Sequence, residues 1–266
     1  MVQELSLVST INKKEFNFVI NSLIALTGQK PRSLTNENII YSPIINLKYL
    51  QSKQAINNSV NLNQIEQHLV KIRRSWQMYS PGKKNPNVVV NEILSNDNQL
   101  FMKKVGAGDV KLGERDTTND GENQYSFQIS DIPAAGKRKV SSQTIYEVNI
   151  KQSATALRSY MMNLGYVEKQ RFLIKGLKFL YNGVVNIEIF QVFAIDATDG
   201  KTVVQIIDGS ENWFLKAYVN VAKITDISLI NKASSDLALL QKNVGNLIKL
   251  KIPDRGLMDS RINDNL

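Results

Sequence analysis

The sequence predicts an α+β fold that is mainly antiparallel β, a closed β-barrel with flanking helices. Two observations carry this prediction. Strand-like apolar runs separated by short turn sequences fill much of the second half of the chain, and amphipathic helical stretches lie on both sides of them. Because a meander of antiparallel strands leaves open edges, it tends to close into a barrel or to pack against helices.

The strand series is predicted over residues 166–181, 184–195, 202–207 and 213–224. Asn182-Gly183 joins the first two runs, and this dipeptide is typical of a two-residue hairpin turn because both residues tolerate positive φ. Short turns that contain Asp-Gly join the others. The spacing therefore predicts four consecutive antiparallel strands.

Three segments are predicted to be helices. Residues 13–27 place Phe16, Val19, Ile20, Leu23 and Leu26 on one stripe, and Gly28 follows where a C-cap belongs. Residues 153–164 form the second helix, which Gly165 closes. The third begins at the Thr225-Asp226 cap and extends to Val244. We expect all three apolar stripes to pack against the sheet.

The middle of the chain carries weaker patterns. We expect a single domain over residues 1–266, with a loose polar insertion around 50–125 that is most mobile at 113–124. Within that range, residues 65–78 are compatible with a short basic helix. The first half lacks enough clear strands to close a sheet of its own, which favours one domain over two.

The C-terminal residues predict a last strand over 247–252, stopped by Pro253. After it, acidic and basic residues alternate around three apolar ones. The charged residues are Asp254, Arg255, Asp259 and Arg261, and the apolar ones are Leu257, Met258 and Ile262. Arginine can hold a carboxylate or backbone carbonyls, so we expect this segment to pack on the barrel or on a partner up to about Arg261, with 263–266 frayed.

Composition excludes several classes of protein. The chain has no cysteine, which rules out disulfides and thiolate metal sites, and its net charge is +9. No apolar run approaches the roughly 20 residues of a membrane span. The first residues carry an acid and no basic region, unlike a secretory signal. We expect a soluble intracellular protein without membrane contact.

A search for catalytic chemistry finds no candidate catalytic, cofactor-binding or metal-ligating residue. His68 is the only histidine, and beside Lys71 and two arginines it is expected to be an exposed surface residue. It cannot build a His/Cys metal site alone. No nucleophile elbow or phosphate-binding glycine loop occurs. We therefore predict a protein that is not an enzyme and has no cofactor.

Two alternatives stay open. A barrel enzyme that cleaves polyphosphates, like an RNA triphosphatase, would need Glu-x-Glu on its strands for metal. Here Glu4, Glu147 and Glu188 each stand alone, although basic residues are present at 169, 171, 175 and 178. A basic nucleic-acid-binding module would rest on the net charge and on segments such as 71–74, but no named module matches, and no specific nucleic acid is expected.

Several short segments of the sequence resemble segments of a known protein family. They are residues 1–7, 126–136 (SFQISDIPAAG), 140–145, 164–167, 214–227 and 253–261 (PDRGLMDSR). In this order they resemble the Mediator subunit 18 family of the fungal type. The positions that match its motifs, with a partner or structural role implied, are Asp131, Ile132, Pro133, Pro253, Asp254, Arg255, Met258, Asp259 and Arg261.

The resemblance implies a nuclear, non-enzymatic subunit of the Mediator head module and a closed antiparallel barrel with helices. It implies pairing with Mediator subunit 20 and a helix received from the C-terminal part of Mediator subunit 8. It also implies contact with the rest of the head module, and a role in assembling RNA polymerase II and the general initiation factors at promoters.

Overall fold

The structure of the protein is a computed structural model. It describes residues 1–44, 67–75, 123–136, 138–198 and 201–262, without the side chains of 196–205. The strands in these residues are β1 (Val2–Ile11), β2 (Arg32–Pro43), β3 (Val70–Ser75), β4 (Asn123–Ser130), β5 (Ser141–Gln152), β6 (Tyr166–Tyr181), β7 (Val185–Thr198), β8 (Lys201–Ile206) and β9 (Trp213–Val221).

Helices are fewer. The described residues form α1 (Phe16–Thr27), α5 (Ala154–Asn163) and α6 (Ile227–Val244), with short 3-10 turns at Lys13–Glu15 and Gly256–Met258. The caps at Gly28 and Asp226 are those that the sequence predicts. Gly28 closes α1 in the left-handed conformation, while the side chains of Ser153 and Asp226 accept hydrogen bonds from the first turns of α5 and α6.

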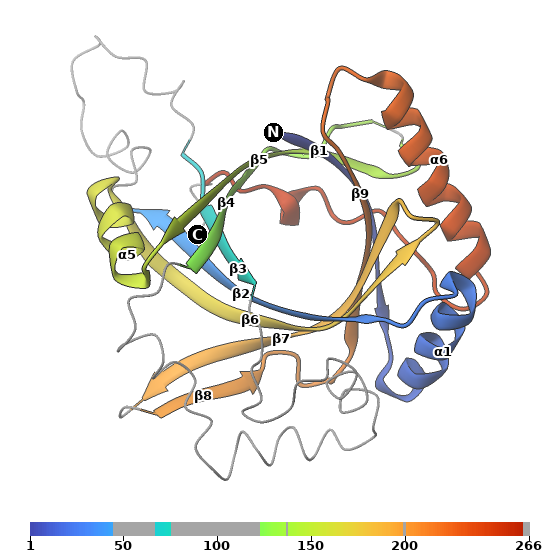
Figure 1. Cartoon of the computed structure of the whole chain (residues 1–266), viewed down its shortest axis with the longest axis horizontal. Coiled ribbons are helices and arrows are strands. Elements are labelled where there is room, and N and C mark those ends of the chain that lie inside the picture. The colour runs from blue at the N-terminus through green and yellow to red at the C-terminus, as the bar shows by residue number, and fades with distance from the viewer. Residues whose placement is uncertain (45–66, 76–122, 137, 199–200, 263–266) are drawn as a thin grey trace.

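The strands close into a ring, which confirms the predicted barrel. In the described chain, eight strands follow one another in the order β1-β5-β4-β3-β2-β6-β7-β9, and β9 returns to β1. Every neighbouring pair in the ring is antiparallel. Figure 1 looks along this ring and places α1 and α6 outside one arc and α5 outside another.

The predicted four-strand meander is correct for three strands and wrong for the fourth. β6 and β7 are joined at Asn182 and Gly183, whose φ angles of 50° and 71° fit the predicted turn. β8 pairs with the end of β7, but β9 pairs with the start of the same β7 edge and with β1 instead of with β8. One edge of the long strand β7 therefore pairs with two strands, β9 at its start and β8 at its end.

Most buried apolar side chains lie outside the ring. A large cluster fills the space between α1, α6 and the outer faces of β1, β6, β7 and β9; its members include Leu5, Leu7, Ile20, Leu23, Leu177, Ile187, Leu237 and Leu240. A second cluster lies under α5 and includes Ile39, Tyr41, Ile72, Tyr125, Leu157 and Met161. The predicted α1 stripe is buried except for Leu26, which is 37% exposed.

Two segments differ from their predicted form. Residues 70–75, assigned to the polar insertion and to a possible short helix, form barrel strand β3, because Val70 and Ile72 alternate with polar residues and bury under α5. Residues 247–252 make only one bridge, Val8 with Lys251, instead of a strand. The predicted mobile stretch 113–124 lies outside the described residues except at its last two positions, where β4 begins.

Candidate functional site

Two of the recognised motifs, far apart in sequence, meet on one side of the barrel. The Arg255 side chain donates through Nε to the carbonyl oxygen of Pro133 at 2.7 Å. The Gln143 amide donates both to the carbonyl oxygen of Asp131, at 2.7 Å, and to that of Met258, at 2.8 Å. Asp131 in turn accepts from the Ile132 backbone N–H at 2.9 Å. The motif residues thus hold each other in place.

Within the C-terminal segment, each aspartate stabilises a local turn. Asp254, directly after Pro253, accepts from the backbone N–H of Gly256 at 2.8 Å. Asp259 receives the guanidinium of Arg261 through Nε at 3.0 Å and a terminal nitrogen at 2.7 Å. This hydrogen bond from Arg261 lowers the pKa of the Asp259 carboxyl below its usual value.

The end of the segment pairs with the chain just before β3. The backbone N–H of Leu69 donates to the Ser260 carbonyl at 2.7 Å, and that of Ile262 donates to Gln67 at 2.9 Å. The His68 ring nitrogen Nδ1 lies 3.0 Å from the Ser260 hydroxyl. The prediction of an exposed His68 is wrong, since the residue is half-buried against the C-terminal segment.

These contacts confirm that residues 253–262 pack back on the barrel. Met258 is half-buried as expected, but Leu257 is 87% exposed, against the expectation that the apolar residues of the segment bury. The partner role of the motif positions remains a prediction, and residues 263–266 lie outside the described chain.

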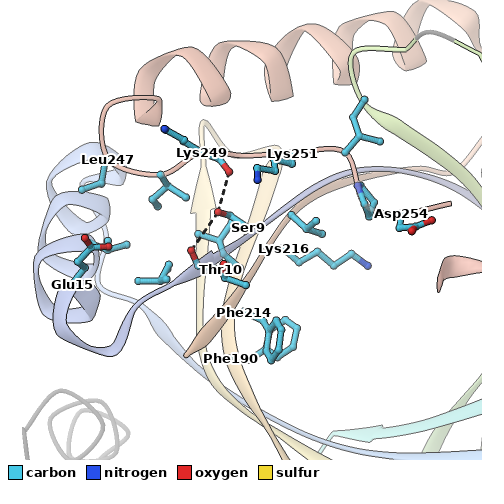
Figure 2. A pocket seen from close by; sticks show the side chains of 17 residues that line it. Ser9, Thr10, Glu15, Phe190, Phe214, Lys216, Leu247, Lys249, Lys251 and Asp254 are labelled. Atoms are coloured by element: carbon cyan, nitrogen blue, oxygen red, sulfur yellow. Dashed lines mark hydrogen bonds between the residues drawn. The ribbon is translucent and has the colours of Figure 1, made fainter. Parts of the chain in front are cut away.

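An apolar groove lies where β1, β9 and residues 247–254 meet. Its volume is about 690 Å³. Figure 2 shows the Ser9 hydroxyl donating to the carbonyl of Lys249, at 3.0 Å, and the Phe190 and Phe214 rings close together. The apolar lining includes Val8, Ile11, Val19, Leu215, Ile248 and Ile252.

Charges at this groove are more often basic than acidic. Lys216, Lys249 and Lys251 line it, against Glu15 and Asp254. We did not predict the groove from sequence, because a regular strand at 247–252 would have closed against β1. The sequence pattern that could have indicated this groove is the alternation of Ile248 and Leu250, which are buried, with lysines, which are exposed.

The interior of the barrel is lined by charged residues, most of them paired. Three contacts, named here the lumen ion pairs, join Lys216 to Glu4 at 2.9 Å, Lys178 to Glu188 at 3.2 Å and Arg73 to Glu147 at 3.8 Å. Tyr218 donates to Glu188 at 2.7 Å. Burial and the neighbouring Glu188 carboxylate raise the pKa of the Tyr218 hydroxyl well above its usual value.

The basic residues that a tunnel enzyme would need are only partly inside. Lys178 faces the interior, but Arg171 lies outside with Glu37 and Glu168, at 2.9 Å from each. Lys175 shares the outer face of β6 with Leu177. Among the described residues, no three acidic or histidine side chains gather as a metal site would require, and no helix is long and apolar enough to cross a membrane.

Fold and site together define a helix-flanked antiparallel barrel with an ion-paired interior, a packed C-terminal segment and an apolar groove at its rim. The family model described as Med18 protein matches residues 3–261. The chain therefore belongs to the Med18 protein family.

Relatives that carry one name match all or part of the chain. The chain is 34% identical over 265 residues to "Mediator of RNA polymerase II transcription subunit 18" of Kluyveromyces lactis, covering 99% of both chains. It is 40% identical over 149 residues to the protein of that name from Saccharomyces cerevisiae, covering 54% of this chain and 47% of the relative. A chain of the Schizosaccharomyces pombe Mediator head module shares the fold, with a TM-score of 0.63, 14% identity and coverage of 94% and 98%.

Proposed function

We propose that this chain is a non-catalytic subunit of the Mediator head module and acts in the nucleus as an adaptor for RNA polymerase II transcription. Membership of the Med18 family is the observation that carries the proposal. Its direct partners are Mediator subunit 20 and the C-terminal helix of Mediator subunit 8. Through them it contacts the rest of the head module, RNA polymerase II and the general initiation factors.

The groove at the barrel rim is the docking place for the subunit 8 helix in this proposal. An amphipathic helix binds by laying its apolar face into an apolar groove. The groove has that lining, and Lys249 and Lys251 favour a helix with acidic residues beside the apolar face, since Lys216 is already paired with Glu4. Its edge residue Ile252 is 48% exposed and is therefore available to a partner.

The test is capture from co-expression. A tagged chain should retain subunit 20 and the subunit 8 segment, and their binding should raise its melting temperature by linkage. Ile252→Glu should release the subunit 8 segment and keep subunit 20. Leu239→Glu is the matched control, because Leu239 is 45% exposed on α6 and outside the groove.

Two results would contradict the proposal. If the wild-type chain captures neither protein, the adaptor function fails. If the chain captures both and Ile252→Glu binds the subunit 8 segment as tightly as Leu239→Glu does, the function stands and the groove is the wrong docking place.

A further inference from the structure

One wall of the rim groove is a length of chain that is held at its two ends. Residues 247–254 form this wall, named here the groove wall. Near its middle, Lys251 exchanges two backbone hydrogen bonds of 2.8 Å with Val8 of β1. In the described chain the backbone pairing of the wall with β1 is this single bridge. Pro253 cannot extend it, because proline has no backbone N–H.

The far end of the groove wall is held by the C-terminal segment. Ile252, Pro253 and Asp254 still line the groove, and the next residue, Arg255, donates to the Pro133 carbonyl at 2.7 Å. The three lining residues lie between the bridge to β1 and this hydrogen bond, so both attachments fix their position. Arg255 itself lies just outside the groove lining.

Beyond the groove, the C-terminal segment crosses one mouth of the barrel. The Met258 carbonyl accepts from the side chain of Gln143, which lies opposite Glu4 and therefore shares its lumen-facing side. Figure 1 shows the short 3-10 turn that holds Met258 within the outline of the ring. The segment ends beside the chain before β3, where the Leu69 N–H donates to the Ser260 carbonyl. It thus reaches from the groove to the opposite side of β4.

Hydrogen bonds hold this segment, and apolar burial contributes little. Leu257 is 87% exposed and Met258 is only half-buried. Each hydrogen bond contributes modestly, because the donor and the acceptor can bond to water instead. Segments with few buried apolar contacts open at a lower free energy than the core does. We therefore expect the segment to detach while the barrel stays folded, which leaves the end of the groove wall without its attachment.

A helix in the groove contacts the end of the wall only when the wall is in place. Binding therefore favours the attached state of the C-terminal segment. By linkage, the attached state favours binding to the same extent, because both events prefer one conformation.

We propose that Arg255 is a positioning residue for the rim groove, and that docking of an amphipathic helix in the groove and attachment of the C-terminal segment stabilise each other. This inference rests on the proposed function, in which the subunit 8 helix occupies the groove. Arg255 acts through the groove wall and does not need to touch the helix.

The first measurement is the affinity of the purified full-length chain for the purified C-terminal segment of Mediator subunit 8, by calorimetric titration. Arg255→Ala should weaken the affinity at least about fivefold, the low end of ordinary coupling between two sites. Arg138→Ala is the matched control. It removes another exposed arginine, whose hydrogen bond also ends in the link between β4 and β5, at the Ala135 carbonyl, and it should bind like the wild-type chain.

The second measurement is amide hydrogen exchange at a saturating concentration of the subunit 8 segment. Binding should slow exchange at Leu69 and Ile262, whose N–H groups join the end of the C-terminal segment to the chain before β3, outside the groove. A role of Arg255 in stability alone would not produce this protection. The Val184 amide, in the turn between β6 and β7, is the control and should exchange at the same rate with and without the segment. In Arg255→Ala the protection should disappear.

The outcomes separate this inference from the function on which it rests. If the wild-type chain does not bind the segment, or if Ile252→Glu binds it as tightly as wild type, the groove is not the docking place and the inference fails with it. If Ile252→Glu weakens binding while Arg255→Ala binds like Arg138→Ala, the docking place stands and the role of Arg255 is refuted. Unchanged exchange at Leu69 and Ile262 in the wild-type chain refutes the coupling even where a variant does not fold.

Discussion

The Arg255 guanidinium donates a 2.7 Å hydrogen bond to the carbonyl oxygen of Pro133, a residue 122 positions earlier in the chain. Each belongs to a motif by which the sequence resembles its family. The bond fastens the C-terminal segment to the link between β4 and β5. The structure thus gives these motif residues a role in holding the chain together.

Arg255→Ala should destabilise the protein by about 1 kcal/mol, the usual net value of such a hydrogen bond. Urea denaturation measures the change. Arg138→Ala is the control, because the Arg138 bond to the Ala135 carbonyl is longer, at 3.3 Å, and exposed. Equal losses of stability in the two variants would show that the hydrogen bond to Pro133 contributes no more than the exposed one does.

Deletion of residues 253–266 should lower the melting temperature by more than about 5 °C, because several hydrogen bonds are lost together. Gln143 loses one acceptor, and the Leu69 N–H loses the Ser260 carbonyl. Thermal denaturation of the truncated chain is the measurement. An unchanged melting temperature would mark the segment as an ordinary dispensable terminus.

Gly176→Ala should destabilise the barrel by about 1–3 kcal/mol, the range for overpacking. A methyl group at Gly176 would collide with the backbone carbonyl of Ile189, which the paired strand β7 cannot easily move. Gly209→Ala, where nothing lies within 4 Å of the added carbon, should change stability little. Chemical denaturation of both variants compares them, and similar stabilities would contradict the close approach of β6 and β7.

Lys71→Met should stabilise the protein at pH 7, and the gain in stability should shrink as pH rises. The folded-state pKa of Lys71 is about 8 against 10.5 in a free lysine, so the unfolded state binds more protons between these values. Wild-type stability therefore rises across pH 8–10.5, while the variant lacks this dependence. Denaturation of both proteins at pH 7, 9 and 10.5 measures this dependence, and a constant difference in stability would refute the lowered pKa of Lys71.

Purified protein with magnesium or manganese should release no phosphate from nucleoside triphosphates or from RNA with a 5′-triphosphate. Glu4 and Glu188, which face the lumen, are already paired with lysines. A phosphate-release assay measures this. Turnover that disappears in Glu188→Gln would instead support the triphosphatase alternative.

Local patterns predicted much of this fold. Glycine and Asx caps fixed the helix ends, and Asn182-Gly183 fixed the β6–β7 hairpin, because these signals depend only on neighbouring residues. The partner of β9 could not be predicted in that way. Pairing with β1 joins residues some 200 positions apart, and no local feature of Trp213–Val221 distinguishes β1 from β8 as its neighbour.

The candidate site was predicted unevenly. The alternation of Asp and Arg after Pro253 predicted an ordered segment, and Asp259 with Arg261 forms the expected fork. The lumen residues were missed, since a charged residue on an alternating strand predicts a solvent-facing side chain as readily as one inside a ring. That Arg73 faces the inside of the ring can be told only when the register of β2 and β3 is known.

The two apolar clusters lie against different arcs of the ring, one under α1 and α6 and one under α5. A polar interior separates them, so neither cluster packs against the other through the middle of the barrel. We therefore expect α5 and its cluster to melt while the larger cluster stays intact, which would divide the barrel into two foldons. Amide hydrogen exchange in β3 and β4 would then be governed by a lower opening free energy than exchange in β1, β7 and β9.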